Sequence, residues 1–311
     1  RLAVIGDPID HSLSPQIHTA AIGPFLKSLK YEKVKVERSG LAEWMENPAR
    51  SEYDGFNVTM PHKEDIIPFI DRIDEEAEKM GSVNTIVNRG GELWGFSTDG
   101  EGFAAALKSI GRSFEGTEVA IIGSGGAAAT IAMKAAREGA SKIHIMARSR
   151  GKSIGILHKV EAAYGSTGGA DRETVGSADH ETMRKPLCYL HPFPRENPGS
   201  IPADSAENPQ NSQIIVNATS LGMKGTGEDY PDFSFLNNFG PDAVICDIVY
   251  DPEKTGLMEE AEKRGFETLG GIHMLIEQAL KSDCLYLDVE INRAKAYNRV
   301  VDSLKGRLGE I

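Results

Sequence analysis

Short apolar runs alternate along this chain with polar and glycine-rich segments. Residues 119–122 are apolar throughout, as expected of a strand that is buried on both faces. Further strands are expected at 2–5, 31–36, 56–60, 143–147, 213–217, 243–250 and 266–269. Helices are expected at 16–26, 41–47, 71–81, 103–110, 127–137, 255–264, 272–279 and 289–304. The repeated change from strand to helix predicts an α/β protein.

Polar side chains interrupt the apolar pattern in the first third of the chain. Residues 56–60 alternate between apolar and polar, as in a strand with one polar face. Pro61 ends that strand, and Lys63 is expected to begin a helix that continues past residue 67. Residues 83–96 read as a hairpin around a pair of glycines. Asn84 falls inside its first strand, and because Asn is uncommon in strands we expect a specific partner for its side chain.

A glycine-rich turn follows the apolar run at 119–122. Gly123, Gly125 and Ala128 have G-x-G-x-x-A spacing, and an alanine-rich helix is expected directly after them. Strand, glycine turn and helix in this order form the first half of a dinucleotide-binding unit, in which the backbone approaches a pyrophosphate closely. The helix N-terminus supplies free N–H groups to the phosphates. A nucleotide cofactor is therefore predicted, the alternative being a purely structural turn.

Basic residues follow the next expected strand, where an NAD-binding unit carries an acid for the ribose 2′-hydroxyl. Arg148 and Arg150 stand there, with Ser149 between them and no acidic residue. Guanidinium groups suit a 2′-phosphate, which a carboxylate would repel. This favours NADP over NAD, although two ordinary surface arginines would give the same pattern.

Two further stretches leave alternatives open. Ser12 and Ser14 precede Pro15 at the start of an expected helix, where hydroxyl groups can either cap the helix or bind a carboxylate. Residues 165–211 show no clear periodicity and are rich in Pro, Gly, Ser and Asn. We interpret most of that segment as a surface excursion.

Composition excludes several classes of protein. At 311 residues two domains are the natural expectation, and the formal net charge of −12 argues against a nucleic-acid surface. No apolar run approaches the length of a membrane span. The three cysteines have neither metal-site nor disulfide spacing, so no metal is expected and a reducing cytoplasm is the default location.

Nine motifs in sequence order resemble those of the shikimate dehydrogenase family. They are HSLSP at 11–15, NVTMPHK at 57–63, GSVNT at 81–85, STDG at 97–100, GSGGAA at 123–128, ARS at 147–149, NATSLGM at 217–223, DIVY at 247–250 and GGIHMLIEQ at 270–278. The resemblance covers nearly the full length of the chain. It implies NADP-dependent reduction of 3-dehydroshikimate to shikimate in the shikimate pathway, in the cytoplasm, by a monomer or homodimer that uses no metal.

The resemblance also implies a domain organisation. An N-terminal α/β substrate domain would span 1–104, and a Rossmann-like NADP-binding domain would span 105–270. C-terminal helices at 271–311 would return to the first domain. Two crossings of the chain, near Ala104 and near Gly271, would then let the domains close over a cleft between cofactor and substrate.

Roles for individual residues follow from the same resemblance. Lys63 would be the proton donor, paired with Asp99, since hydride delivery to a ketone builds negative charge on its oxygen. The substrate would be bound by Ser12, Ser14, Thr59, Lys63, Asn84, Asp99, Tyr250 and Gln278. The cofactor would be bound by Gly123, Ser124, Gly125, Gly126, Ala127, Ala147, Arg148, Ser149, Arg150, Asn217, Ala218, Thr219, Met223 and Gly271.

Some positions depart from the family pattern. Ser97 stands where Asn is usual before Thr-Asp, Thr19 replaces an Asn, and Ala147 replaces the Asn of Asn-Arg-Ser. None of these changes removes a proposed catalytic group. Quinate-using relatives often differ at the second serine, so Ser14 favours shikimate. The alternatives are a quinate/shikimate dehydrogenase using NAD or NADP, and a non-catalytic ligand sensor, which would need neither Lys63 nor Asp99.

Overall fold

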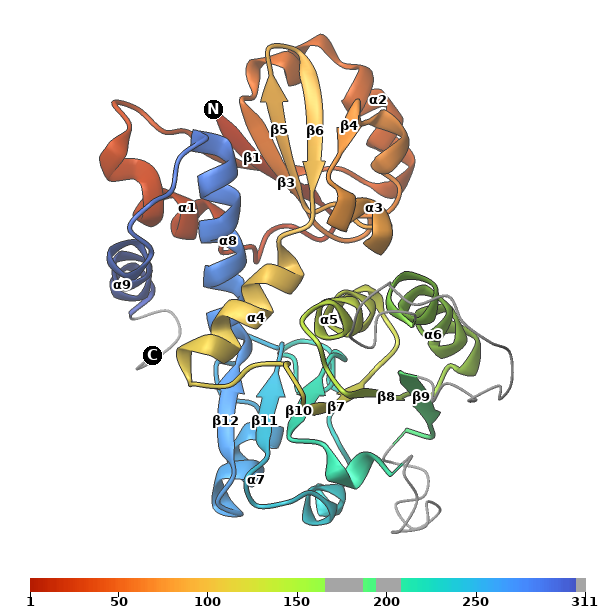
Figure 1. Ribbon diagram of the computed structural model, residues 1–311. Coiled ribbons are helices and arrows are strands. Elements are labelled where there is room, and N and C mark those ends of the chain that lie inside the picture. The colour runs from red at the N-terminus through yellow and green to blue at the C-terminus, as the bar shows by residue number, and fades with distance from the viewer. Residues whose placement is uncertain (166–186, 194–207, 306–311) are drawn as a thin grey trace, which may run out of the picture.

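Two sheets organise the protein, and they lie one above the other in Figure 1. The computed structural model describes residues 1–165, 187–193 and 208–305, and six strands of these residues make up each sheet. The first sheet has the order β2-β1-β3-β5-β6-β4 and the second the order β12-β11-β10-β7-β8-β9. The expected α/β class with a Rossmann-like half is confirmed.

The first sheet is mixed. Its strands are β1 (Leu2–Gly6), β2 (Tyr31–Lys35), β3 (Gly55–Val58), β4 (Arg72–Ile73), β5 (Thr85–Arg89) and β6 (Glu92–Phe96). β1 pairs in parallel with β2 and β3, whereas β3, β5 and β6 pair antiparallel, which confirms the expected hairpin. Helices α2 (Leu41–Glu46) and α3 (Glu75–Met80) belong to this half. Phe56, Ile66 and Ile86 are fully buried in its core.

The second sheet is parallel throughout. Its strands are β7 (Glu118–Ile122), β8 (Lys142–Met146), β9 (Cys188–His191), β10 (Ile214–Asn217), β11 (Val244–Asp247) and β12 (Glu267–Gly270). Apolar clusters cover both of its faces, together with α5 (Gly126–Arg137), α6 (Arg150–Tyr164) and α7 (Gly256–Lys263). The strand order reverses between β7 and β10, which creates the crevice where such sheets bind ligands.

Two helices connect the two halves. α4 (Asp99–Ser109) leads from the first sheet toward the second, and α8 (Gly271–Leu287) leads back beside it. α8 and α9 (Arg293–Leu304) share an apolar cluster with α1 (Ser14–Ile22), so the C-terminal helices pack on the first half of the chain (Figure 1). α4 and α8 approach closely because Gly102 has no side chain: a Cβ there would lie 2.6 Å from the backbone N of Gln278.

Three sequence expectations need correction. Lys63 lies in a turn, not at the start of a helix, because its carbonyl accepts from Val83 N (2.8 Å) and only a short 3₁₀ turn follows at Ile67–Phe69. The helix expected at 71–81 is confined to Glu75–Met80, since Arg72–Ile73 first pairs with β6. The segment 165–211 contains the strand β9, which extends the sheet beside β8. Residues 166–186 and 194–207 of that segment lie outside the described residues.

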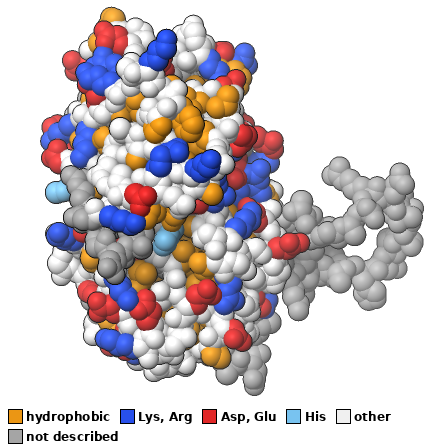
Figure 2. Space-filling view, turned by 90° about the vertical axis from the view of Figure 1, so that its left-hand side faces the viewer, with side chains coloured by type: hydrophobic (Ala, Val, Ile, Leu, Met, Phe, Trp, Pro, Cys, Tyr) orange, Lys and Arg blue, Asp and Glu red, His pale blue; other side chains and the backbone are white. Residues whose placement is uncertain are grey.

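The surface carries both signs of charge. Figure 2 views the side on which α1 and α9 lie, where Lys and Arg are interspersed with Asp and Glu, and hydrophobic side chains occur in several places between them. The net charge of −12 is therefore not gathered into one acidic surface on this face. Among the helices that the structure describes, none has both the length and the apolar character needed to span a bilayer.

Candidate active site

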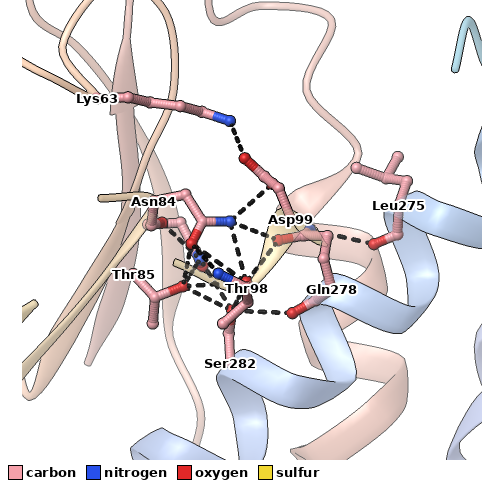
Figure 3. Close-up of polar contacts among 9 residues, drawn as sticks. Lys63, Asn84, Thr85, Thr98, Asp99, Leu275, Gln278 and Ser282 are labelled. Carbon is pink, nitrogen blue, oxygen red and sulfur yellow. Dashed lines mark hydrogen bonds and ion pairs between the residues drawn. The ribbon is translucent and has the colours of Figure 1, made fainter. Parts of the chain in front are cut away.

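Lys63 and Asp99 form an ion pair between two segments of the first half. Lys63 lies in the turn after β3, and Asp99 is the first residue of α4. The Lys63 Nζ lies 2.5 Å from Asp99 Oδ2, and the two side chains keep 33% and 16% of their surface exposed (Figure 3). An ammonium and a carboxylate thus meet where a small molecule can still reach them.

Asn84 fixes the direction of the Asp99 carboxylate. The backbone N of Thr98 donates to Asn84 Oδ1 (2.8 Å), so the amide nitrogen of Asn84 must point the other way. That nitrogen donates to Asp99 Oδ1 (2.8 Å) and is also 2.9 Å from Thr98 Oγ1. Asn84 was expected inside a strand and directly precedes β5, but it has the specific partner that was predicted for its side chain. The other oxygen of Asp99 is left for Lys63.

Gln278 reaches the same cluster from α8. Its Oε1 lies 3.2 Å from the amide nitrogen of Asn84 and 3.3 Å from Thr98 Oγ1, while its Nε2 donates to the carbonyl of Leu275 (3.1 Å). The missing side chain of Gly102 allows this approach. The structure thus brings together Lys63, Asn84, Asp99 and Gln278, although 215 residues separate the first from the last in the numbering (278 − 63).

The serine pair does not cap α1. The N-cap residue is Leu13, and no side chain caps this helix. Ser12 Oγ lies 3.2 Å from Ser14 Oγ and accepts from the backbone N of Ser14 at 3.3 Å. Of the two interpretations left open by the sequence, capping is therefore not observed.

Thr59 and Tyr250 come from different halves of the chain. Thr59 directly follows β3, its N donates to Ile5 O (3.0 Å), and its methyl group packs against Gly6, where a Cβ would lie only 2.4 Å away. Tyr250 follows β11 and packs at the edge of the apolar cluster of α1, α8 and α9. Burial raises the pKa of its phenol.

The glycine turn lies at the crevice of the second sheet. Gly123 has φ +123°, and a Cβ there would come within 2.7 Å of the Ala218 carbonyl O, so glycine is required. Gly125 is the N-cap of α5, and both it and Gly126 are exposed with open space around them. Ser124 and Ala127 are half-buried beside them. An anionic group can therefore approach the N-terminus of α5 closely.

The loop after β10 lies at the same edge of the second sheet as the glycine turn. Asn217 is fully buried, and its amide donates to Asp247 Oδ1 (3.0 Å) while its oxygen accepts from Thr219 Oγ1 (2.7 Å) and from the Tyr230 hydroxyl (3.1 Å). The Asn217 side chain therefore shapes the loop from inside. Met223, farther along it, is 42% exposed.

Two exposed arginines follow β8 at the same edge of the sheet. Arg148, Ser149 and Arg150 are exposed, whereas Ala147 is buried. The guanidinium of Arg148 lies 5.8 Å from the ring centre of Phe193, and Ser149 caps α6. Within the described residues, neither arginine forms an ion pair with a carboxylate.

Gly271, the last predicted cofactor residue, begins α8. A Cβ at this position would lie 2.2 Å from the Ile248 carbonyl O, so only glycine fits where the chain leaves β12.

Four residues of the cluster were not predicted from the sequence: Asn57, Thr85, Thr98 and Ser282. Asn57 lies within an expected strand, and the rarity of Asn in strands, which was the signal for Asn84, could have identified it, whereas Thr85 gives no such signal because Thr is common in strands. Ser282 follows Gln278 by four residues, one helical turn, but a serine on a helix gives no signal of its own. Ser97, one of the departures, is buried, and its hydroxyl has no hydrogen-bond partner among the described residues.

The sequence of this chain is similar to those of known proteins. Residues 4–86 match the family described as the shikimate dehydrogenase substrate binding domain. The shikimate dehydrogenase (NADP+) of Streptococcus pneumoniae strain JJA is 33% identical over 292 residues, which cover 93% of this chain and 92% of that protein.

Two solved structures are similar over almost their whole length. A shikimate dehydrogenase in complex with NADP+ shares 28% identity, with a TM-score of 0.79 and coverage of 98% of this chain and 95% of that one. The ligand-free 5-ketofructose reductase of Gluconobacter sp. strain CHM43 shares 26% identity, with a TM-score of 0.77 and coverage of 97% of both chains.

Fold and site together define an α/β protein whose Rossmann-like half faces a lysine–aspartate pair held by the other half. The identity over most of the chain narrows this class. The chain belongs to the shikimate dehydrogenase family.

Proposed function

We propose that this protein catalyses the NADP-dependent, reversible reduction of 3-dehydroshikimate to shikimate. The observation that carries the proposal is the Lys63–Asp99 ion pair, whose carboxylate is oriented by Asn84. Its support is the identity to curated NADP-dependent shikimate dehydrogenases over most of the chain.

In this reaction Lys63 moves the proton. Bound NADPH would supply the hydride for the substrate carbonyl. The Lys63 ammonium stabilises the negative charge that grows on the carbonyl oxygen and donates its proton there. Asp99 keeps the ammonium in place, and Asn84 keeps Asp99 in place. In the oxidative direction the neutral amine of Lys63 accepts the proton of the alcohol.

The other polar residues bind the substrate. Ser12 and Ser14 bind the carboxylate, since their hydroxyl groups are not used to cap α1. Thr59, Asn84, Asp99 and Gln278 hydrogen-bond to the ring hydroxyls, and Tyr250 adds a contact.

NADP fits the second half of the chain. The exposed glycines at the start of α5 leave room for the pyrophosphate, and the exposed Arg148 and Arg150 suit the 2′-phosphate, with Ser149 between them and Ala147 behind. The remaining contacts are assigned to the turn and to the loops after β10 and β12: Gly123, Ser124, Gly125, Gly126, Ala127, Asn217, Ala218, Thr219, Met223 and Gly271. Asn217 contributes by holding its loop.

We further propose the domain bounds 1–104, 105–270 and 271–311, with the last segment part of the first domain. The two domains close over the cleft about the crossings near Ala104 and Gly271. The protein acts in the cytoplasm as a monomer or homodimer.

A second candidate is a related polyol dehydrogenase. The similarity to a 5-ketofructose reductase favours considering other polyhydroxy ketones, and quinate with NAD or NADP is the nearest variation of the substrate. A non-catalytic sensor on the same scaffold has less support, because binding alone needs no lysine–carboxylate pair.

Steady-state kinetics separate these functions. kcat/KM is measured for shikimate, quinate and reduced 5-ketofructose, each with NADP+ and with NAD+, and shikimate with NADP+ is expected to give the highest value. A higher kcat/KM for quinate with NAD+ would contradict the proposal. Binding of shikimate without turnover of any of the three substrates would indicate the sensor.

A further inference from the structure

Thr85 and Ser282 join the first sheet to α8 by a buried polar contact. Their hydroxyl oxygens lie 2.8 Å apart, and neither residue has exposed surface. Thr98 Oγ1 is 3.1 Å from Ser282 Oγ, and the amide nitrogen of Asn57 is 3.1 Å from Thr85 Oγ1. Figure 3 shows Thr85 and Ser282 below Asn84, with Ser282 on the same helix as Gln278.

Two hydrogen bonds of this group have a fixed direction because they end on carbonyl oxygens, which only accept. A carbonyl oxygen only accepts, so Ser282 donates its single proton to the Gln278 carbonyl (3.0 Å). The proton of Thr85 then has two acceptors within reach, Ser282 Oγ (2.8 Å) and Asn84 Oδ1 (3.1 Å), of which Ser282 Oγ is the closer. By the same reasoning the amide nitrogen of Asn57 donates to the carbonyl of Asn84 (3.1 Å). The contacts form one connected buried polar cluster.

This polar cluster supports the reacting groups from α8 and from the first sheet. Ser282 ties α8 to the strand that precedes the hairpin turn, and so holds Gln278 beside Asn84. Asn57 holds the backbone of Asn84, whose side chain orients Asp99. The Tyr31 hydroxyl donates to Asn57 Oδ1 (2.7 Å) and is also hydrogen-bonded to Ser14. The serine pair and the lysine–aspartate pair therefore share one buried network.

We propose that Thr85 and Ser282 are positioning residues for the reaction. Their hydroxyl pair holds α8 against the first sheet at the place where Gln278, Asn84 and Asp99 must keep their mutual geometry. A Thr85 hydroxyl that has lost Ser282 would turn to Asn84 Oδ1, 3.1 Å away, and disturb the amide that orients Asp99. The inference rests on the proposed function, because proton transfer through Lys63 is what this geometry serves.

The test compares two substitutions at one position. Thr85→Val keeps the shape of the side chain and removes the hydroxyl, whereas Thr85→Ser keeps the hydroxyl and removes a methyl group. Ser282→Ala removes the partner. Ser303→Ala is the control, because Ser303 also donates to a carbonyl of its own helix, Val300 O (2.7 Å), but lies in α9 away from the cluster.

We expect Thr85→Val and Ser282→Ala to lower kcat/KM for shikimate by about tenfold to a hundredfold, the size of effect that a small misplacement produces. KM for NADP+ should keep its wild-type value in both. Thr85→Ser and Ser303→Ala should retain the wild-type kcat/KM, even if Thr85→Ser melts at a lower temperature.

Equal kcat/KM for Thr85→Val and Thr85→Ser would overturn the inference, because the presence of the hydroxyl group would then make no difference to the reaction. If the wild-type protein oxidises shikimate and this equality is found, the inference fails alone. If the wild-type protein does not oxidise shikimate at all, the proposed function fails and the inference fails with it.

Discussion

The ammonium of Lys63 can donate three hydrogen bonds, and Asp99 Oδ2 takes one of them. The remaining N–H groups can meet a substrate oxygen, and nothing else in the cluster of Figure 3 carries a positive charge. Lys63→Ala removes both the proton and the charge. We therefore expect kcat to fall by about 10²- to 10⁴-fold with a much smaller change in KM for shikimate.

Stopped-flow or steady-state oxidation of shikimate with NADP+ checks this prediction. Lys295→Ala, which removes an exposed lysine of α9, should leave both constants unchanged. Near-normal turnover of Lys63→Ala would take Lys63 out of the mechanism and leave the ion pair with Asp99 as a structural contact.

At the scale of elements, the close packing of α4 on α8 determines where Gln278 lies. A Cβ on Gly102 would stand 2.6 Å from both the backbone N and the Cβ of Gln278, and backbone cannot turn aside as a flexible side chain can. Gly102→Ala should push the two helices apart, destabilise the fold by about 1–3 kcal/mol, and lower kcat/KM for shikimate.

Denaturant unfolding and shikimate kinetics on the same variant measure the two effects. Gly155→Ala is the matched control: it also lies inside a helix, α6, but a Cβ there would meet no atom within 4 Å. The control should be neutral or slightly stabilising. If Gly102→Ala behaves like Gly155→Ala, the packing of α4 on α8 does not set the position of Gln278.

Elements with a strong local pattern were predictable from the sequence. The apolar strands of the second sheet and the glycine turn before α5 were expected close to where they occur, because burial on both faces and G-x-G-x-x-A spacing are local signals. Lys63 and Asp99 were assigned through motif resemblance. Their pairing depends on a turn that the chain takes because Val83 binds the carbonyl of Lys63, and that contact spans twenty residues (83 − 63).

Contacts between distant segments were not predictable in this way. β9 is short and follows a stretch without periodicity, so only its pairing with β8 identifies it as a strand. Ser282 acquires its role from Thr85, 197 residues away in the chain. A polar residue on a helix is ordinarily solvated, and only the fold shows that this one has no exposed surface.

At the scale of the whole molecule, the two halves also meet through charges. Lys134 of α5 keeps only 3% of its surface exposed. Its ammonium contacts Glu101 of α4 and Glu76 of α3 (3.8 Å). Arg137 pairs with the same Glu76. Since α3 belongs to the first sheet and α5 to the second, these ion pairs complement the packing of α4 on α8 and join the halves at a second place.

The stability of the whole fold should depend on pH through a buried and a half-buried histidine near the edge of the second sheet. His144 of β8 lies 2.9 Å from His191 of β9 and within reach of Glu118 (3.5 Å) and Lys142. Burial lowers the pKa of His144 from 6.5 to about 4, and burial lowers that of His191 likewise to about 4.

Between these values the unfolded chain binds protons that the folded chain refuses, so the free energy of unfolding should decrease as pH falls from 6.5 to about 4. Asp247 acts in the opposite sense. Burial raises its pKa from 3.8 to about 6, so the folded chain binds the extra proton in that window, and this contribution to stability is lost as pH rises. The two effects overlap, and the pH dependence of the wild-type protein alone cannot separate them.

His144→Leu separates them, because Asp247 contributes equally to variant and wild type and cancels in their difference. The substitution can lower the melting temperature at neutral pH through altered packing. As pH falls from 6.5 to about 4, we expect the melting temperature of the variant to rise relative to that of the wild type. His158→Leu is the control, since His158 is exposed on α6 and loses little hydration on folding. A difference between His144→Leu and wild type that stays constant across this range would show that the buried imidazole does not limit the stability of the fold in acid.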